Sequence, residues 1–283
     1  MNQLKHFDTL VQRLVEFNIP SPRLEARLLL AHILDKNHDD VSIINAELNE
    51  EQVNQLEDLV VRRTINHEPL DKILGKKGFY KYEFIVDGNV LSPRPDTEIL
   101  LEEAIYLSKD KALKILDLGT GSGCILLSLL KENIQLEGVG VDISTKALDV
   151  AQKNAIALSV ANQVKWVNAD WFDENFLDKI NAKFDMIISN PPYIPNKDII
   201  ALDPEVKNHD PMLALSGGED GYDSYQRIAE LTPYLLKDEG YILLECGIEQ
   251  FQKVADIFIK NKLSLHKIVK DLQNIERCVI LKK

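Results

Sequence analysis

The chain has 283 residues, of which 45% are apolar and 28% charged, a composition typical of a globular protein with room for one large and one small domain. Its 33 basic and 45 acidic residues give a net charge of −12 at pH 7, so we expect no direct nucleic-acid substrate, although a local basic patch would be compatible with this charge. No apolar run is long enough to span a bilayer, and no signal-peptide pattern opens the chain, so we expect a soluble, cytoplasmic protein without membrane contacts.

The cysteines and histidines suggest neither disulfides nor a metal site. Cys124, Cys246 and Cys278 are widely spaced among apolar residues, which is typical of reduced thiols in the core of a cytoplasmic protein. The six histidines are scattered, and no metal-ligand spacing occurs.

Residues 1–75 are predicted to form a helical domain. Apolar residues at helical spacing predict a first helix around residues 7–15. Ser21 and Pro22 supply an N-cap and a first-turn proline for a second helix, and Asn49 with Gln52 resembles the capping box of a third. We expect a small bundle that docks a macromolecular substrate; the alternative is an appendage that only stabilises the chain.

Residues 76–92 are predicted to form a β-hairpin that links the bundle to the main domain, which begins at residue 93. Residues 79–86 are aromatic and β-branched, Asp87 and Gly88 form a turn signal, and residues 89–91 return as the second arm. The next stretch, Arg94-Pro95-Asp96-Thr97-Glu98, opens a helix that Asp96 or Thr97 can cap. A role for this stretch in an active site is the alternative to capping.

A glycine-rich loop follows the first strand of the main domain, which is predicted at residues 115–118. The loop consists of Gly119, Thr120, Gly121, Ser122 and Gly123. A strand, a glycine loop and an apolar helix form the first unit of a nucleotide-binding α/β sheet, because the missing side chains let a ligand approach the backbone. Cys124 stands where a dinucleotide fingerprint requires glycine, and the Lys-Ser or Lys-Thr pair of a P-loop is missing from this loop. Asp117 suits a cationic or hydroxyl-bearing ligand.

Two further strands are predicted to end on polar or aromatic side chains. Residues 138–142 end at Asp142, which is placed to accept hydrogen bonds from both hydroxyls of a ribose. Residues 164–167 lead to Asp170, which can bind an adenine amino group, and to Trp171. The Trp171 ring can either stack on a purine, for about 1–3 kcal/mol, or simply pack in the core.

The fourth strand, residues 184–189, ends on Asn190, Pro191, Pro192 and Tyr193. Two prolines cannot continue a strand, because they lack backbone N–H groups and hold the preceding residues extended. The strand end therefore presents an amide side chain, two rigid carbonyl groups and an aromatic ring. Ligands bind at this end of an α/β sheet, and these acceptors suit a planar amino group; a proline-rich turn without a function is the alternative.

The remaining residues complete the sheet. Residues 194–223 are polar and rich in turns, and we expect them to form a partial lid over a bound peptide. A helix at residues 225–236, a strand at 241–245, a helix at 249–262 and two strands around Leu265 and Val279 follow. The predicted fold is α/β, with a Rossmann-like sheet of seven strands and antiparallel pairing at its end.

These motifs together resemble the S-adenosylmethionine-dependent methyltransferases that modify exocyclic or amide nitrogens. Four stretches resemble, more narrowly, the peptide chain release factor glutamine methyltransferases, the PrmC/HemK family: residues 94–98, 119–123, 190–193 and 214–221. The resemblance covers nearly the whole chain. It implies a methyltransferase domain at residues 93–283 that uses S-adenosyl-L-methionine and releases S-adenosyl-L-homocysteine.

The resemblance also implies roles for individual residues. The loop from Gly119 to Gly123 would hold the methionine portion of the cofactor, Asp142 the ribose, and Trp171 one side of the adenine. Asn190 would contact both cofactor and substrate. Residues 190–193 would bind the side-chain amide of the glutamine in the Gly-Gly-Gln motif of class I release factors, the expected partner of a monomeric enzyme.

Two other functions remain open at this stage. A nucleic-acid adenine or guanine methyltransferase uses the same four residues on a flipped base, but the acidic charge and the lack of a separate basic domain disfavour it. A non-catalytic binding module is disfavoured by the intact glycine loop, Asp142 and Asn190.

Overall fold

The computed structural model describes residues 6–283; the first five residues, with which the predicted helical domain begins, lie outside the described part. The chain forms two compact units. The helical unit contains residues 6–75 and a later segment, Asp203–His209. The sheet unit contains Lys76–Leu202 and Asp210–Lys283. The chain thus leaves the sheet unit for one short segment and then returns to it.

The helical unit is built around one apolar core. Its elements are α1 (His6–Glu16), α2 (Pro22–Leu34), the 3₁₀ helix η1 (Val41–Asn45), α3 (Glu50–Thr64), α4 (Leu70–Leu74) and α9 (Pro204–His209). Phe7, Leu14 and Leu30 are among the side chains buried at its centre. The predicted capping box of α3 is confirmed, since Asn49 and Gln52 each accept a hydrogen bond from the other's backbone N–H. Ser21 precedes α2 as predicted but forms no side-chain cap bond.

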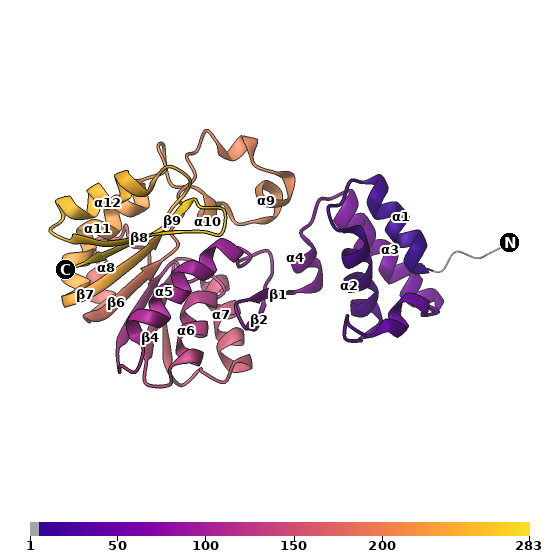
Figure 1. The fold of residues 1–283 in the computed structure, drawn as a ribbon, viewed down its shortest axis with the longest axis horizontal. Coiled ribbons are helices and arrows are strands. Elements are labelled where there is room, and N and C mark those ends of the chain that lie inside the picture. The colour runs from indigo at the N-terminus through magenta and orange to yellow at the C-terminus, as the bar shows by residue number, and fades with distance from the viewer. Residues whose placement is uncertain (1–5) are drawn as a thin grey trace. The chain divides into compact units, whose positions relative to one another are not determined.

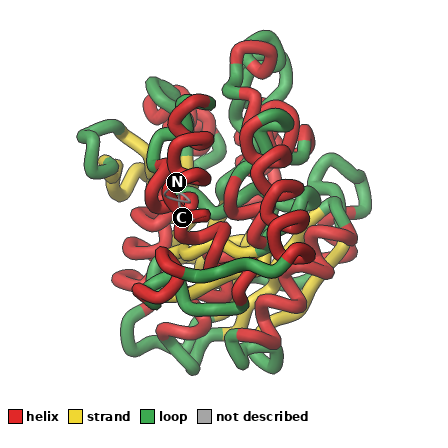
Figure 2. The backbone as a smooth tube through the Cα atoms, turned by 90° about the vertical axis from the view of Figure 1, so that its right-hand side faces the viewer, coloured by secondary structure: helices red, strands yellow, loops and turns green. Residues whose placement is uncertain are grey.

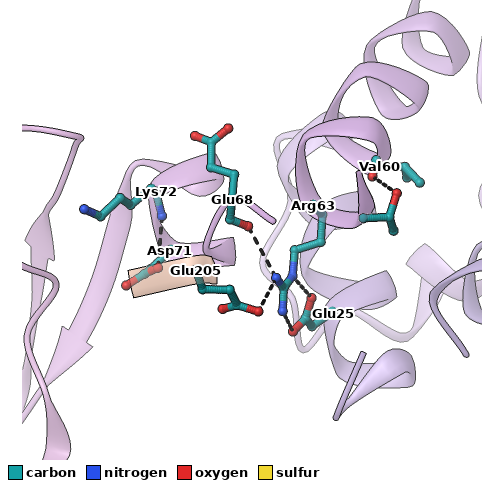
Figure 3. A network of polar contacts seen from close by, with 8 residues as sticks. Glu25, Val60, Arg63, Glu68, Asp71, Lys72 and Glu205 are labelled. Atoms are coloured by element: carbon teal, nitrogen blue, oxygen red, sulfur yellow. Dashed lines mark hydrogen bonds and ion pairs between the residues drawn. The ribbon is translucent and has the colours of Figure 1, made fainter. Parts of the chain in front are cut away.

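A buried arginine ties α9 to the other helices of this unit (Figure 3). Arg63 is 3% exposed. Its Nε and Nη2 atoms donate to the Glu25 carboxylate at 2.6 and 3.0 Å, and its Nη1 donates to Glu205 on α9 at 2.7 Å. His209, at the end of α9, places its Nε2 2.7 Å from the carbonyl oxygen of Asn66. Residues separated by more than half of the chain therefore share one polar network.

The sheet unit begins with a small hairpin whose pairing differs from the prediction. Strands β1 (Lys76–Phe79) and β2 (Tyr82–Ile85) pair through a turn at Tyr80, whose φ is 55°. A turn does form at residues 87–90, where the Val90 N–H donates to the Asp87 carbonyl oxygen at 3.4 Å, but the prediction that it closes the hairpin was wrong, since residues 89–91 form no strand. The observed turn buries Phe79 and Phe84 together, with their rings 6.1 Å apart edge to face; this burial outweighs the local turn signal of Asp-Gly.

Seven strands form the main sheet, as predicted, in the order β5-β4-β3-β6-β7-β9-β8. The strands are β3 (Lys114–Leu118), β4 (Glu137–Asp142), β5 (Val164–Asn168), β6 (Phe184–Ser189), β7 (Leu236–Glu245), β8 (Ser264–Lys270) and β9 (Glu276–Lys282). Neighbours from β5 to β7 are parallel, whereas β9 pairs antiparallel with both β7 and β8. The late antiparallel pairing is confirmed.

Helices cover both faces of this sheet (Figures 1 and 2). One face carries α5 (Glu98–Ser108), α6 (Cys124–Glu132) and α7 (Thr145–Ala157), and the other α8 (Phe176–Ile180), α11 (Asp223–Leu235) and α12 (Phe251–Lys260). Side chains along β6 alternate between the two cores: Ile187 packs in one, Met186 and Ile188 in the other. The continuous apolar run of this strand follows from burial on both faces.

The direction of strand order reverses between β3 and β6, the position at which open α/β sheets bind ligands. Both strands end here, with Leu118 opposite Ser189. The predicted lid that follows β6 is not a plain loop. It contains the 3₁₀ helix η3 (Ile199–Ala201), the helix α9 and the helix α10 (Met212–Leu215).

Candidate active site

A cavity of about 420 Å³ lies at the carboxyl ends of the parallel strands, within the usual size range of small-molecule sites. It belongs entirely to the sheet unit. The predicted site residues that line it are Gly119, Thr120, Gly121, Ser122, Asp142, Asp170, Trp171, Asn190 and Pro192. Gly123, Pro191 and Tyr193 are not among the lining residues. Four strand ends that are far apart in sequence thus meet at one cavity.

The glycine loop is held open by left-handed backbone at its glycines. Gly119 has φ of 74° and Gly121 has φ of 56°, a region that side chains disfavour. The N–H groups of Gly119 and Thr120 both donate to the carbonyl oxygen of Val141 at 2.9 Å, which fixes the loop to the end of β4. A Cβ at Gly121 would meet no atom within 4 Å, so this backbone is open to a ligand.

Asp117, at the end of β3, supports the loop from behind. Its side chain is 1% exposed and accepts a hydrogen bond from Thr120 Oγ1 at 2.6 Å, while Oδ1 has no hydrogen-bond partner. Burial raises the pKa of this carboxyl to about 7, and the nearby charge of Asp142 acts in the same direction. Asp117 does not line the cavity, so we assign it to shaping the loop rather than to direct binding.

Asp142 joins the loop to the start of α7. Its Oδ2 accepts from the Gly121 N–H and its Oδ1 from the Ser144 N–H, both at 2.9 Å. Burial raises the pKa of this carboxyl, and these backbone hydrogen bonds oppose the shift. Each carboxylate oxygen has a further lone pair, so the pair of oxygens fits vicinal hydroxyl groups. Ser144 also caps α7, because its Oγ accepts from the Ala147 N–H.

Aromatic and apolar side chains form another wall. Trp171 lies against Gly119, where an added Cβ would be 3.4 Å from the indole ring, and Asp170 accepts from the Phe172 N–H at 2.8 Å. Phe172 and Ile143 also line the cavity and are 53% and 47% exposed. The sequence analysis missed these two residues, although each directly follows a predicted site residue at a strand end. Flat apolar surface beside carboxylates suits a nucleoside base.

Asn190 lines the cavity on the side of the β6 end. Its Nδ2 donates to Thr97 Oγ1 at 3.3 Å. Thr97 does not cap α5 through its side chain, contrary to the capping alternative. Instead, this residue of the 94–98 stretch faces the site, and it lines the cavity as well.

Tyr193 and Pro191 do not line the cavity. Tyr193 is partly buried; its carbonyl oxygen accepts from Gln250 Nε2 at 3.0 Å, and its ring approaches Gly247. Burial raises the pKa of the Tyr193 hydroxyl, and the charge of Glu245 adds to the shift. The expected packing of Tyr193 on a substrate amide stays a prediction.

Glu245, at the end of β7, is a further polar residue that the sequence analysis missed. It is 3% exposed, and its Oε2 has no hydrogen-bond partner among residues 6–283. Burial raises the pKa of its carboxyl to about 7, while hydrogen bonds from Thr97 and Asn190 and the charge of Arg277 lower it. A single acid at the end of the apolar run 241–244 was the available signal.

The rim of the cavity combines an ion pair with exposed apolar side chains. Arg94 Nη2 donates to the Asp210 carboxylate at 2.7 Å, so the stretch before α5 is joined to the segment that precedes α10. Met212 and Leu213 on α10 line the cavity and are 54% and 63% exposed. No local sequence pattern marked this rim, because its two sides come from distant segments.

The residues present fit S-adenosyl-L-methionine. Open glycine backbone, a carboxylate with free acceptor capacity at Asp142, and flat apolar surface at Ile143 and Phe172 match its amino-acid, ribose and adenine parts in turn. Within residues 6–283, no cluster of His, Cys, Asp and Glu side chains could hold a metal ion, and no helix is long and apolar enough to cross a membrane.

Known protein families match both units of the chain. Residues 4–75 match the family described as PrmC N-terminal domain, and residues 90–203 match the methyltransferase small domain. The release factor glutamine methyltransferase of Rhodospirillum rubrum is 38% identical over 96% of this chain and 82% of the relative. That of Agrobacterium fabrum is 36% identical over 96% of this chain and 94% of the relative. The chain spans only about half of a bifunctional methyltransferase of Rickettsia felis, with 37% identity over 55% of that protein.

Solved structures agree on the fold. A methyltransferase from Pyrococcus furiosus superposes with a TM-score of 0.51 and 14% identity, covering 83% of this chain and 99% of that chain. An SAM-dependent methyltransferase from Agrobacterium tumefaciens gives a TM-score of 0.50 and 14% identity over 73% of this chain and 69% of that chain. At this identity the similarity concerns the fold alone.

Proposed function

Because this chain belongs to the family of release factor glutamine methyltransferases, we propose that it methylates the side-chain amide nitrogen of a release factor glutamine. The glutamine is the one in the Gly-Gly-Gln motif of class I peptide chain release factors. One observation carries the proposal within this chain: the open glycine loop and the Asn190 side chain line one cavity from adjacent strand ends. A methyl donor and a planar amide would meet there.

When bound, S-adenosyl-L-methionine supplies a methyl group that its positively charged sulfur makes electrophilic, and S-adenosyl-L-homocysteine is the product. In the proposed arrangement, the loop from Gly119 to Gly123 holds the methionine portion through its four residues that line the cavity. Asp142 accepts hydrogen bonds from the ribose hydroxyls, and Asp170 and Trp171 hold the adenine. These roles use groups that line the cavity.

The chain must make a poor nucleophile reactive, because the lone pair of an amide nitrogen is delocalised into its carbonyl group. We propose that Asn190 Oδ1 and the Pro191 carbonyl oxygen accept the two amide protons. This holds the nitrogen in line with the methyl carbon and favours a lone pair on it. On transfer, a nitrogen–carbon bond would form as the carbon–sulfur bond of the donor breaks, and the nitrogen would then release a proton to water. That proton is strongly acidic once the bond has formed, so no side chain is needed as a base.

The helical unit is proposed to bind the body of the release factor. It has its own apolar core, and none of its described residues, from residue 6 onward, lines the cavity. We expect the enzyme to act as a monomer in the cytoplasm, where its substrate is used; light scattering of the purified chain measures the oligomeric state.

The decisive experiment offers labelled S-adenosyl-L-methionine to the purified chain with a class I release factor. A release factor with Gln→Glu in its Gly-Gly-Gln motif is the matched control, and a duplex oligonucleotide and ribosomal RNA test the alternative substrate class. We expect label only on the intact release factor, and peptide mass spectrometry places one methyl group on the glutamine side chain. Label on the nucleic acids, or equal label on the Gln→Glu release factor, contradicts the proposal.

A further inference from the structure

The Asn190 carboxamide has an NH₂ end that donates hydrogen bonds and an oxygen end that accepts them. The neighbouring side chains of Thr97 and Glu245 interact differently with these two ends. Asn190 Nδ2 donates to Thr97 Oγ1 at 3.3 Å, and both side chains lie close enough to the buried Glu245 carboxyl to lower its pKa. Thr97 and Glu245 are each only 3% exposed, so water cannot replace either partner easily. The environment of the amide on this side is therefore fixed by protein atoms.

An ionised carboxylate accepts hydrogen bonds but donates none. Because Asn190 Nδ2 donates to Thr97 Oγ1, the hydroxyl oxygen acts as an acceptor toward Asn190, and the single hydroxyl proton is available to the Glu245 carboxylate. Only the NH₂ end of the Asn190 amide can donate to both acceptors. The carbonyl end has no proton to donate, so in the reversed amide the one Thr97 proton cannot serve both Asn190 Oδ1 and the carboxylate, at the usual cost of an unpaired buried polar group, about 1–3 kcal/mol.

We propose that Glu245 and Thr97 are positioning residues that fix the orientation of the Asn190 carboxamide, with NH₂ toward these two side chains and Oδ1 toward the substrate amide. This inference rests on the proposed function, since an acceptor oxygen matters only if the substrate presents an NH₂ group. It also gives a role to residues 94–98, for which the local sequence left two possibilities open: capping of α5 or a place in the active site.

The other polar members of that stretch have separate partners. Asp96 pairs with Arg277 Nη2 at 3.2 Å, and Glu98 accepts from the Tyr80 N–H at 2.9 Å. These contacts attach the stretch to β9 and to the hairpin turn. Thr97 is thereby held at a fixed place beside Asn190, as a positioning residue must be.

The charge state of Glu245 should control this orientation. Burial raises the pKa of its carboxyl to about 7, so near neutral pH it changes from acceptor only to a form with an O–H donor. The charged and titratable groups that face it are Arg277 from β9, which favours ionisation, Asp96 beside Thr97, which opposes it, and the Tyr193 hydroxyl. Below about pH 7 the protonated carboxyl can donate to Asn190 Oδ1 and stabilise the reversed amide, so methyl transfer should fall.

The test measures methyl transfer to a release factor by the full chain and by paired variants. Glu245→Gln keeps the shape of the side chain but offers an NH₂ group toward Asn190; Thr97→Val removes the hydroxyl and Thr97→Ser retains it. Glu132→Gln is the control, because that carboxylate pairs with Lys81 and Tyr82 and does not line the cavity. We expect kcat to fall about 10-fold or more in Glu245→Gln and Thr97→Val, since small misplacements of reacting groups have effects of this size.

The remaining results separate positioning from a merely structural role. Cofactor Kd by calorimetry should stay within about twofold of wild type in every variant, and Thr97→Ser should restore most of kcat. The rise of kcat through pH 7 in the wild type should be absent in Glu245→Gln. Unchanged kcat in both Glu245→Gln and Thr97→Val, or a loss of kcat matched by an equal loss of cofactor affinity, overturns the proposal. If Glu245→Gln does not fold, the proposal is tested by the kcat values of Thr97→Val and Thr97→Ser and by the pH profile of the wild type.

A second readout needs no release factor and so separates this inference from the proposed function. The side-chain NH₂ signal of Asn190 in ¹⁵N-labelled protein is assigned by its loss in Asn190→Ala. We expect this signal to shift as pH passes through about 7 in the wild type but not in Glu245→Gln. A signal that does not respond to pH overturns the inference even if the release factor is methylated, and a shift with no methylation contradicts the proposed function alone.

Discussion

Ser189 Oγ donates a hydrogen bond of 2.7 Å to the carbonyl oxygen of Leu118, which joins the last residues of β6 and β3. Ser189 is completely buried, so this bond is protected from water. The glycine loop begins directly after Leu118, and Asn190 follows Ser189. The two parts of the site that would hold donor and acceptor are therefore attached to one rigid pair of strand ends, which is the preorganisation that a transfer reaction needs.

Replacing Asn190 with alanine should impair chemistry far more than cofactor binding. The substitution removes the proposed acceptor for one amide proton, and losing one positioned group at a reacting centre typically lowers turnover by about 10²-fold or more. Single-turnover methylation of a release factor measures the rate, and calorimetry measures cofactor affinity. Asn133→Ala is the control, since Asn133 binds the carbonyl groups of Ser108 and Lys111 outside the cavity. Near-normal turnover of Asn190→Ala would remove Asn190 from the mechanism.

Asp142 should determine cofactor affinity rather than turnover. Asp142→Ala loses both the proposed ribose contacts and the bonds to the N–H groups of Gly121 and Ser144. A hydrogen bond to a charged group is worth about 1.5–3 kcal/mol, so we expect Kd for S-adenosyl-L-methionine to rise by about 10- to 100-fold. Asp142→Asn keeps one acceptor oxygen and should give a smaller rise. An unchanged Kd in Asp142→Ala, measured beside Asp185→Asn as a control outside the cavity, argues against the ribose contact.

The strand ends of the site were predictable because parallel strands bring their carboxyl ends to one edge of a sheet. Asp142, Asp170, Trp171 and Asn190 each follow a recognisable apolar run, and all of them line the cavity. The local sequence pattern alone was enough to predict these residues, because the topology of the fold brings the ends of the parallel strands together.

Other features depend on which segments of the chain lie side by side in the fold, and no local sequence pattern encodes this. Glu245 reaches Asn190 because β6 and β7 are neighbours, with Ser189 opposite Leu244, and Thr97 is 93 positions away from Asn190. The hairpin turn lies at Tyr80 and not at the predicted residues 87–88, because the pairing around Tyr80 buries Phe79 in the core. Likewise, the assignment of residues 203–209 to the helical unit follows from contacts across the chain and not from their composition.

Removing the charge of Asp117 should stabilise the protein increasingly as pH rises toward about 7. Burial raises the pKa of this carboxyl to about 7 in the folded state, from an ordinary value of 3.8. Between these values the folded state binds one proton more than the unfolded chain, so the contribution of Asp117 to stability falls as pH rises to about 7 and is smallest above it. Asp117→Asn abolishes this loss, which amounts to about 1.4 kcal/mol for each unit of pKa difference.

Thermal unfolding of wild type and Asp117→Asn at about pH 5 and about pH 8 measures the effect. We expect the advantage of the variant to grow toward the higher pH. The same substitution at the exposed Asp149 serves as the control. An equal difference between Asp117→Asn and wild type at both pH values would show that the Asp117 carboxyl does not titrate in this range.

Two substitutions in the polar network of the helical unit should show that a buried ion pair contributes more to stability than an exposed one. Arg63→Met leaves the Glu25 carboxylate, whose side chain is 12% exposed, without its cation, and breaking a buried pair in this way costs about 3–5 kcal/mol. Glu205→Gln weakens only the contact to α9, through a carboxylate that is 41% exposed, and should cost about 1 kcal/mol or less.

Hydrogen exchange resolves the two effects by segment: Glu205→Gln should speed exchange in Pro204–His209 alone, whereas Arg63→Met should speed it in α2 and α3 as well. Equal protection of Pro204–His209 in wild type and Arg63→Met would mean that the arginine does not hold this segment, and that the apolar contacts of the unit suffice.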